Sequence, residues 1–218
     1  MADSADPRRA RTRAALVAAA QTLLIQNRTN VSILEITQLA GVGQGSFYNH
    51  FPSKEALFAA AIDNVVEMHG RLVDQVTEAI DDPAEVFARA FRLTGRFHRL
   101  LPSASQVLLR RGLDLVTAPE GLAPRAKRDI QRGIAAGRFS VTDPELAFVA
   151  TAGTSLALGQ LLHAEPDRDA ARAADQLAAD LLCMFGVPAD EAAEICARPL
   201  PDLDQLLTSV VDDSNQIT

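Results

Sequence analysis

Val31 to Leu57 reads VSILEITQLAGVGQGSFYNHFPSKEAL, and this stretch decides the fold that we expect. Ser32 and Glu35 have the spacing of a capping box, which begins a short helix. Gly41 ends that helix, and a second short helix must end before Pro52, which has no backbone N–H to continue the hydrogen-bond ladder. Two short helices joined by a tight turn predict a helix-turn-helix.

The rest of the chain is helical in period as well. Apolar residues recur at spacings of three and four, and no segment alternates apolar and polar residues as a strand would. We therefore predict an all-α fold, with helices over about residues 7–26, 33–40, 44–50, 54–80, 84–100, 103–116, 122–136, 144–163, 168–185 and 189–197. From residue 199 on, a short docked turn and a loose tail are equally compatible with the sequence.

The distribution of charge favours a DNA-binding end. The 218 residues carry a formal net charge of −7, which by itself argues against a nucleic-acid partner. Residues 1–54, however, hold six basic and three acidic residues, a net charge of +3, so the remainder carries −10. A small basic end on an acidic body is typical of a DNA reader with a separate second domain.

Several classes of protein are disfavoured by what the sequence lacks. Cys183 and Cys196 form no CxxC pair and have no histidine at ligand spacing, which argues against a zinc site or a disulfide framework. The N-terminus has no signal-peptide pattern, and the uncharged stretch 146–162 is interrupted by small and polar residues, which favours a buried helix over a membrane span. We expect a cytoplasmic protein with no membrane partner, no metal, no cofactor and no catalytic residues, since no catalytic motif emerges.

Isolated polar residues have mostly structural interpretations. Arg110 and Arg111 lie near Asp114 on an otherwise apolar helix, where they could reach an anionic ligand or form an ion pair, and we favour the ion pair. Three histidines are expected to be partly buried or surface residues and not metal ligands or bases: His69, His98 and His163.

The second short helix supplies most of the candidate DNA contacts. Its first residues would face base edges, where the Gln44 amide suits adenine, and its last residues suit phosphate or sugar. Lys54, at the start of the following helix, would reach a DNA phosphate. The N-terminal residues Arg8, Arg9, Arg11 and Arg13 are equally compatible with phosphate or minor-groove contact and with a solvated terminus. The predicted DNA-binding residues are Gln44, Gly45, Ser46, Tyr48, Asn49, His50, Lys54 and Arg11.

At Ile36 to Leu57 the sequence resembles the signature of the TetR family of bacterial transcription regulators. The matching positions include Ala40-Gly41-Val42, His50-Phe51 and Ser53-Lys54-Glu55. Two positions depart from the family pattern. Thr37 replaces a usual alanine, and Gly43 replaces the serine or threonine that would cap the second short helix.

The resemblance implies a three-helix DNA-binding domain followed by a helical domain for ligand binding and dimerisation. We place the first in residues 1–54, the second in 55–198 and an acidic tail in 199–218. The family also implies an effector pocket between the fourth helix and those after it, for which the candidates are Met68, Phe87, Phe91, Leu108, Leu115, Phe148 and Ser155. A plain hydrophobic core is at least as compatible with any one of them. In the family the last two long helices of each subunit form a four-helix bundle, for which the candidate contacts are Leu158, Leu161, Leu162, Leu177, Leu181 and Met184. An internal core is the alternative for these helices, and the sequence does not separate the two.

The hypothesis from sequence is a homodimeric repressor that binds a palindromic double-stranded DNA operator and responds to a small apolar or amphipathic effector. An activator is one alternative. Another is a helical interaction or enzyme scaffold whose DNA-binding module is degenerate, supported by the acidic body and by Gly43.

Overall fold

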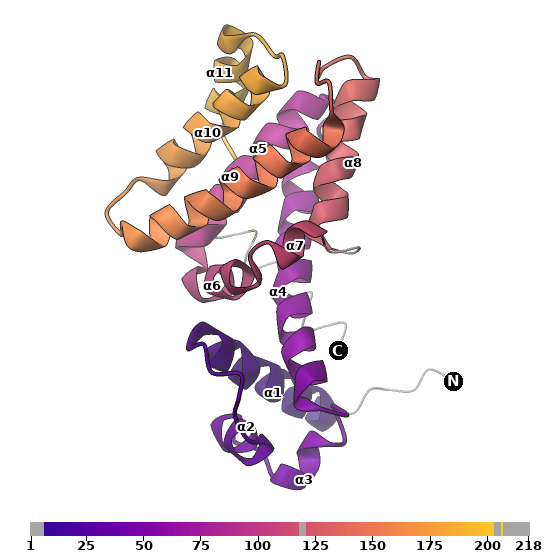
Figure 1. The fold of residues 1–218 in the computed structure, drawn as a ribbon, viewed down its shortest axis with the longest axis vertical. Coiled ribbons are helices and arrows are strands. Elements are labelled where there is room, and N and C mark those ends of the chain that lie inside the picture. The colour runs from indigo at the N-terminus through magenta and orange to yellow at the C-terminus, as the bar shows by residue number, and fades with distance from the viewer. Residues whose placement is uncertain (1–6, 118–120, 203–205, 207–218) are drawn as a thin grey trace.

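The computed structural model describes residues 7–117, 121–202 and 206, which form helices and no strand (Figure 1). The predicted all-α fold is therefore confirmed. The helices are α1 (Pro7–Ile25), α2 (Ile33–Leu39), α3 (Gln44–Phe47), α4 (Lys54–Thr77), α5 (Pro83–Leu100), α6 (Pro102–Arg111), α7 (Asp114–Thr117), α8 (Leu122–Ala135), α9 (Pro144–Ala164), α10 (Ala170–Met184) and α11 (Ala189–Ala197).

Two predicted helices differ in the structure. The helix expected over 103–116 is broken into α6 and α7, because Gly112 adopts a φ of +47° that favours glycine and interrupts the helix. The second short helix is shorter than expected: α3 ends at Phe47, and residues 48–50 form a turn. Most of the tail from residue 199 lies outside the described residues, so its two alternatives stay open.

Side chains cap the helices on both sides of α3. The Ser32 hydroxyl accepts a hydrogen bond from the Glu35 backbone N–H at 3.2 Å, and the Ser53 hydroxyl accepts one from the Ala56 N–H at 3.2 Å. The Glu35 carboxylate forms an ion pair with Arg28. Gly43 stands at the start of α3 and offers no side-chain bond, as its sequence predicts.

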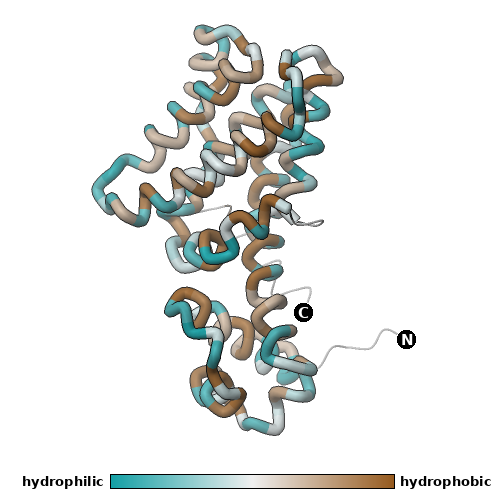
Figure 2. The backbone as a smooth tube through the Cα atoms, viewed as in Figure 1, coloured by the Kyte–Doolittle hydropathy of each residue, from teal (hydrophilic) through white to brown (hydrophobic). Residues whose placement is uncertain are grey.

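The helices gather at two ends of an elongated molecule (Figure 1). One end holds α1 to α3, the other holds α5 and α8 to α11, and α4 runs from the first into the second. The smaller end has its own hydrophobic core, and Figure 2 shows apolar segments along α1 and α2. That core contains, among others, Leu16, Leu23, Ile36, Phe47 and Leu57. Burial of these side chains pins the two short helices against α1 and α4.

The larger end is built around α5 and α10. Phe87, Phe139 and Phe185 pack there with ring centroids 5.0–5.9 Å apart. On the other side of α5, the buried Arg92 donates to the Asp175 carboxylate of α10 at 2.7 Å. These contacts fix the frame against which α8 and α9 pack.

A third hydrophobic cluster joins the two ends. It lies where α4, α5 and α6 meet, and it includes Val65, Leu72, Phe97 and Val107. Gln21 of α1 also donates to the Ala61 carbonyl of α4 at 3.2 Å. The smaller end is therefore packed on the larger one through α4 and α6 and is not tethered by a loop.

Candidate DNA-binding surface and effector cavity

The α3 segment presents the predicted DNA-contact residues outward. Tyr48 is 64% exposed, whereas Phe47 beside it is fully buried. Three further residues are exposed, Gln44, Gly45 and Asn49, and two are half-buried, Ser46 and His50. The buried phenylalanine anchors the segment, so the polar residues around it form a surface available to a partner.

Two arginines of α1 lie against the end of this segment. Arg9 Nη2 donates to the Asn49 backbone carbonyl at 3.5 Å, and the Arg13 guanidinium lies 5.3 Å from the centroid of the Phe51 ring. Burial, and then the charges of Arg9 and Arg13, lower the pKa of His50. His50 is therefore uncharged at neutral pH, and the positive charge of this surface resides on the arginines.

Arg11, the arginine that sequence reasoning selected, is placed differently. It is exposed and its Nε donates to the Pro7 carbonyl of its own helix at 3.3 Å. Arg9 and Arg13, which the sequence offered together with Arg8 and Arg11, are four residues apart on a common helix face on which Arg11 does not lie, and they are the pair that contacts this segment.

Lys54 occupies a position between α2 and α4. Its Nζ lies 3.5 Å from the Val31 carbonyl, and the side chain is partly buried. Its predicted contact with a DNA phosphate stays a prediction.

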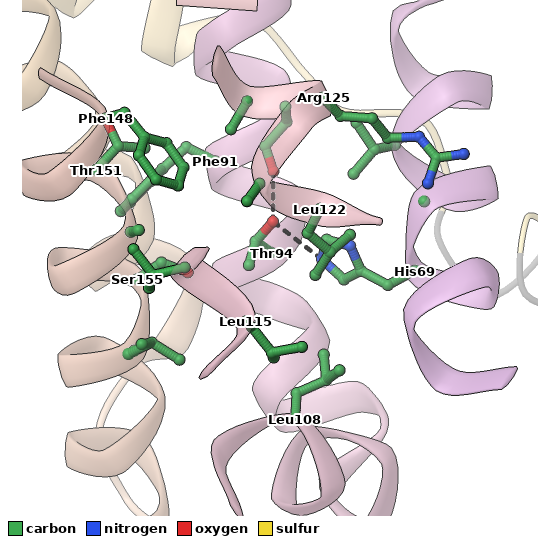
Figure 3. Close-up of a pocket in the computed structure, with 18 of the residues that line it drawn as sticks. His69, Phe91, Thr94, Leu108, Leu115, Leu122, Arg125, Phe148, Thr151 and Ser155 are labelled. Atoms are coloured by element: carbon green, nitrogen blue, oxygen red, sulfur yellow. Dashed lines mark hydrogen bonds between the residues drawn. The ribbon is translucent and has the colours of Figure 1, made fainter. Parts of the chain in front are cut away.

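The larger end contains a cavity of about 160 Å³ that is partly open to solvent (Figure 3). Six helices, α4 to α9, contribute side chains to its wall, which is predominantly apolar. Six of the seven predicted pocket residues line it, namely Phe87, Phe91, Leu108, Leu115, Phe148 and Ser155.

Met68 is the predicted pocket residue that the structure places elsewhere. It packs against the cluster between α4, α5 and α6, while His69 lines the cavity. Neighbouring residues of a helix point about 100° apart, so an error of one position moves a side chain out of the cavity. His69 follows Val65 by four residues on the buried stripe of α4, which is the signal that could have identified it.

The polar residues of the wall include His69, Thr94, Arg125 and Asp129, which sequence reasoning did not select. Arg125 lies over Gly70, where a Cβ would collide with its guanidinium, and reaches Glu67 and Asp74 at 3.8 and 3.6 Å. Asp129 accepts from Arg128 at 2.9 Å. Both charged residues therefore already have partners of opposite charge.

His69 is held by a defined hydrogen bond. Its Nε2 lies 3.0 Å from the Thr94 hydroxyl, which in turn lies 2.8 Å from the Ala90 carbonyl (Figure 3). Burial lowers the pKa of His69 to about 3, and the neighbouring His98 and Arg125 act in the same direction. The ring is therefore neutral at physiological pH.

A second histidine links the cavity to α6 and α9. His98 lines the cavity, and its Nδ1 lies 2.7 Å from the Ser105 hydroxyl, which is 2.9 Å from Nε2 of His163. Burial, and then His163, lower the pKa of His98 to about 4. Gly159 lets the His98 ring pack directly on α9, since a Cβ there would collide with it.

Other side chains have structural roles. Arg111 forms the predicted ion pair with Asp114, at 3.9 Å, while Arg110 bonds to α1. Within the described ranges, no three or more His, Cys, Asp or Glu residues are grouped so that they could hold a metal. Cys183 is exposed and Cys196 is buried, and both thiols are free.

The predicted dimer contacts fall into two groups. Leu158, Leu162 and Leu181 are buried in the core of the subunit itself, so in this structure they are not available to a partner. Leu161 and Met184 are 38% and 51% exposed, and Leu177 is partly buried. The division arises because α9 and α10 each turn one face inward onto α5.

α9 also has an unusually apolar outer face. By length and composition it is the one helix of the described residues that could cross a membrane, and 33% of its most apolar window is buried. Its exposed stripe contains Leu146, Val149, Gly153, Ala157 and Leu161, at spacings of three and four residues. These residues form the α9 stripe.

A helix-turn-helix domain ahead of a helical body with an internal cavity defines a class of protein, the DNA-binding transcription regulators. The comparisons with known proteins agree. Residues 16–61 match the family described as bacterial regulatory proteins of the tetR family, and residues 82–198 match the tetracyclin repressor-like C-terminal domain. The chain belongs to the TetR family of transcription regulators, as its signature predicted.

Solved structures give the same result. RolR in complex with the ligand resorcinol is 36% identical, over 89% of this chain and 97% of that chain, with a TM-score of 0.59. CprB from S. coelicolor A3(2) is 20% identical, over 88% and 97% of the two chains, with a TM-score of 0.64. SmeT, the repressor of a Stenotrophomonas maltophilia multidrug efflux pump, is 18% identical over 79% and 89%, with a TM-score of 0.61. At 20% and 18% identity, CprB and SmeT support the fold alone. No curated protein sequence matches the chain.

Proposed function

We propose that this regulator is a homodimeric cytoplasmic repressor that binds a palindromic operator and releases it when a small effector enters the cavity. The observation that carries the proposal is the continuity of α4, which begins at Lys54, shortly after α3, and places His69 in the cavity wall. A ligand that prefers a different position of α4 would change the separation of the two recognition helices and so shift the population away from the DNA-binding form.

The DNA contacts that we propose are those predicted from the sequence, with Arg9 and Arg13 included beside Arg11. Gln44 and Ser46 would read bases in the major groove, and the residues that follow would contact the backbone. Arg9 and Arg13 join the phosphate contacts because they lie at the end of the same segment. In a dimer the two recognition helices would enter successive major grooves about 34–36 Å apart.

For the dimer interface we propose the outer faces of α9 and α10. The α9 stripe, with Met184 of α10, is an apolar surface that a second copy would bury, and its small residues allow close helix packing. The domain boundaries that we propose remain 1–54, 55–198 and 199–218, with α4 as the physical connection between the first two.

The effector that we propose is one ring in size. The cavity of about 160 Å³ is comparable to an apolar cavity of about 150 Å³ that binds benzene in another protein. RolR, the 36% identical relative, binds resorcinol, which also has one ring. Both observations support a small ligand over an extended lipid or a large drug.

A DNA-binding titration tests this function. Purified protein should bind a labelled fragment from beside its own gene with saturable affinity that resists unspecific competitor DNA, and single-ring compounds, resorcinol among them, should weaken that binding. Gln44→Ala should reduce the preference for the specific fragment, whereas Leu113→Ala, on the exposed joint after α6, should not. Equal affinity for specific and unrelated fragments would contradict the proposal.

A further inference from the structure

His69 is a buried polar side chain whose surroundings indicate the chemistry of the effector. It is 3% exposed and lies on the cavity wall. The same wall contains the apolar Leu122 and Phe91 (Figure 3). A polar ring in such a position is unfavourable unless its nitrogen atoms have hydrogen-bond partners.

The hydrogen bonds fix the tautomer of His69. The Thr94 hydroxyl has one proton, and it donates that proton to the Ala90 carbonyl at 2.8 Å. The same hydroxyl lies 3.0 Å from His69 Nε2, so it must accept there and Nε2 must carry the ring proton. Because the ring is neutral, Nδ1 then carries a lone pair and acts as an acceptor.

Nδ1 of His69 has no hydrogen-bond partner among the described atoms. A buried acceptor without a donor destabilises the site, and a ligand that supplies a donor removes that deficit. Because His69 lies on the cavity wall, a ligand that places a donor group against Nδ1 would remove this deficit.

The charged residues of the wall disfavour an ionic ligand. The Arg125 guanidinium lies within 4 Å of the carboxylates of Glu67 and Asp74, and Asp129 is bonded to Arg128. Since each charge is already balanced, a ligand charge would enter an apolar cavity without a counter-ion, which is costly.

We propose that the effector is an uncharged single-ring compound with a hydroxyl group, and that this hydroxyl donates a hydrogen bond to Nδ1 of His69. The inference rests on the proposed function, because it takes the cavity as the effector site. It assigns His69 as the residue that distinguishes a hydroxylated ring from an apolar ring of the same size, with Thr94 as the residue that sets the tautomer.

Calorimetric titration of the full-length protein with phenol, toluene and benzoate tests the assignment. Phenol and toluene differ by a hydroxyl in place of a methyl group, so the ratio of their affinities isolates the donor. Wild type should bind phenol roughly tenfold more tightly than toluene and should bind benzoate weakest. His69→Phe should reduce the phenol preference to within about twofold while toluene still binds, His69→Gln should restore part of it, and Met68→Leu should behave as wild type.

Nitrogen NMR of histidine-labelled protein gives a second readout that does not depend on the folding of a variant. Without ligand, Nδ1 of His69 should have the shift of an unprotonated nitrogen, and phenol but not toluene should move it. Thr94→Val should release the tautomer and lower the phenol preference.

The possible outcomes distinguish a failure of the His69 assignment from a failure of the proposed function. If single-ring compounds bind and release DNA but wild type and His69→Phe show the same phenol preference, the inference is wrong and the proposed function stands. A protonated Nδ1 in the free protein also overturns it. If none of the compounds binds, the proposed effector site is wrong and the inference is wrong with it.

Discussion

Arg110 of α6 donates a hydrogen bond from Nη2 to the backbone carbonyl of Ile25, the last residue of α1, over 3.4 Å. Leu108, two residues earlier on α6, lines the cavity. α6 therefore contacts both the proposed effector site and the helix that supports the recognition segment. This gives a second path, beside α4, by which a bound ligand can act on DNA affinity.

Replacing Arg110 with alanine should weaken the response to effector more than it weakens DNA binding itself. Coupling residues of this kind contribute about 0.5–2 kcal/mol, so the ratio of operator affinities without and with effector should fall by a factor of roughly 2 to 30. Fluorescence anisotropy with labelled operator measures both affinities. Arg111→Ala is the matched control, because Arg111 pairs with Asp114 and not with α1. An equal loss of coupling in both variants would contradict the role of the bond to Ile25.

The arginines beside the recognition segment should contribute to the salt dependence of DNA binding. Arg9→Ala removes one proposed phosphate contact, so the slope of log K against log salt should become shallower by about 0.9. Titrations at several salt concentrations give the slope. Arg132→Ala, an exposed arginine of α8 in the body, should leave it unchanged. A slope that Arg9→Ala does not alter would remove Arg9 from the interface.

The two buried histidines should make stability depend on pH. The pKa of His69 is lowered from 6.5 to about 3 and that of His98 from 6.5 to about 4, both mainly by burial. Because the unfolded chain binds these protons more readily, the contribution to stability is fully present above pH 6.5 and is lost as pH falls toward the folded pKa. Between pH 7 and 5 each histidine should remove about 2 kcal/mol from the free energy of unfolding.

Urea unfolding at pH 5 to 8 checks this dependence. His69→Phe should reduce the pH-dependent part by about half, since His98 keeps its own contribution. A mutant with the full wild-type dependence would mean that His69 is protonated in the folded state.

The α9 stripe should hold the dimer together. Val149 is 53% exposed. An aspartate in its place would be buried without a counter-ion in the proposed interface, which is unfavourable. Val149→Asp should therefore shift the mass measured by light scattering toward the monomer and weaken operator binding. Leu113→Asp carries the same charge on a residue that is 74% exposed at the α6–α7 joint, and it should remain dimeric. A dimeric Val149→Asp protein would place the interface elsewhere.

The sequence by itself determined the all-α fold, the position of the helix-turn-helix and the family. These follow from local chemistry: the caps at Ser32 and Ser53 and the apolar spacing act within a few residues, and the structure confirms them. The family resemblance also gave Phe87 and Phe91 of α5, one helical turn apart, as pocket candidates, and both line the cavity.

Only the tertiary structure decided which residues of a helix face the cavity, which face the core and which face solvent. His69 and not Met68 lines the cavity, and Leu158 and Leu162 are core residues while Val149 is exposed. Helical periodicity locates an apolar face of a helix, but it does not identify the element that covers that face. Burial along α9 depends on how α5 and α10 pack against this helix. The tautomer of His69, which leaves Nδ1 as an unpaired acceptor, depends in the same way on Thr94, which lies 25 residues further along the chain.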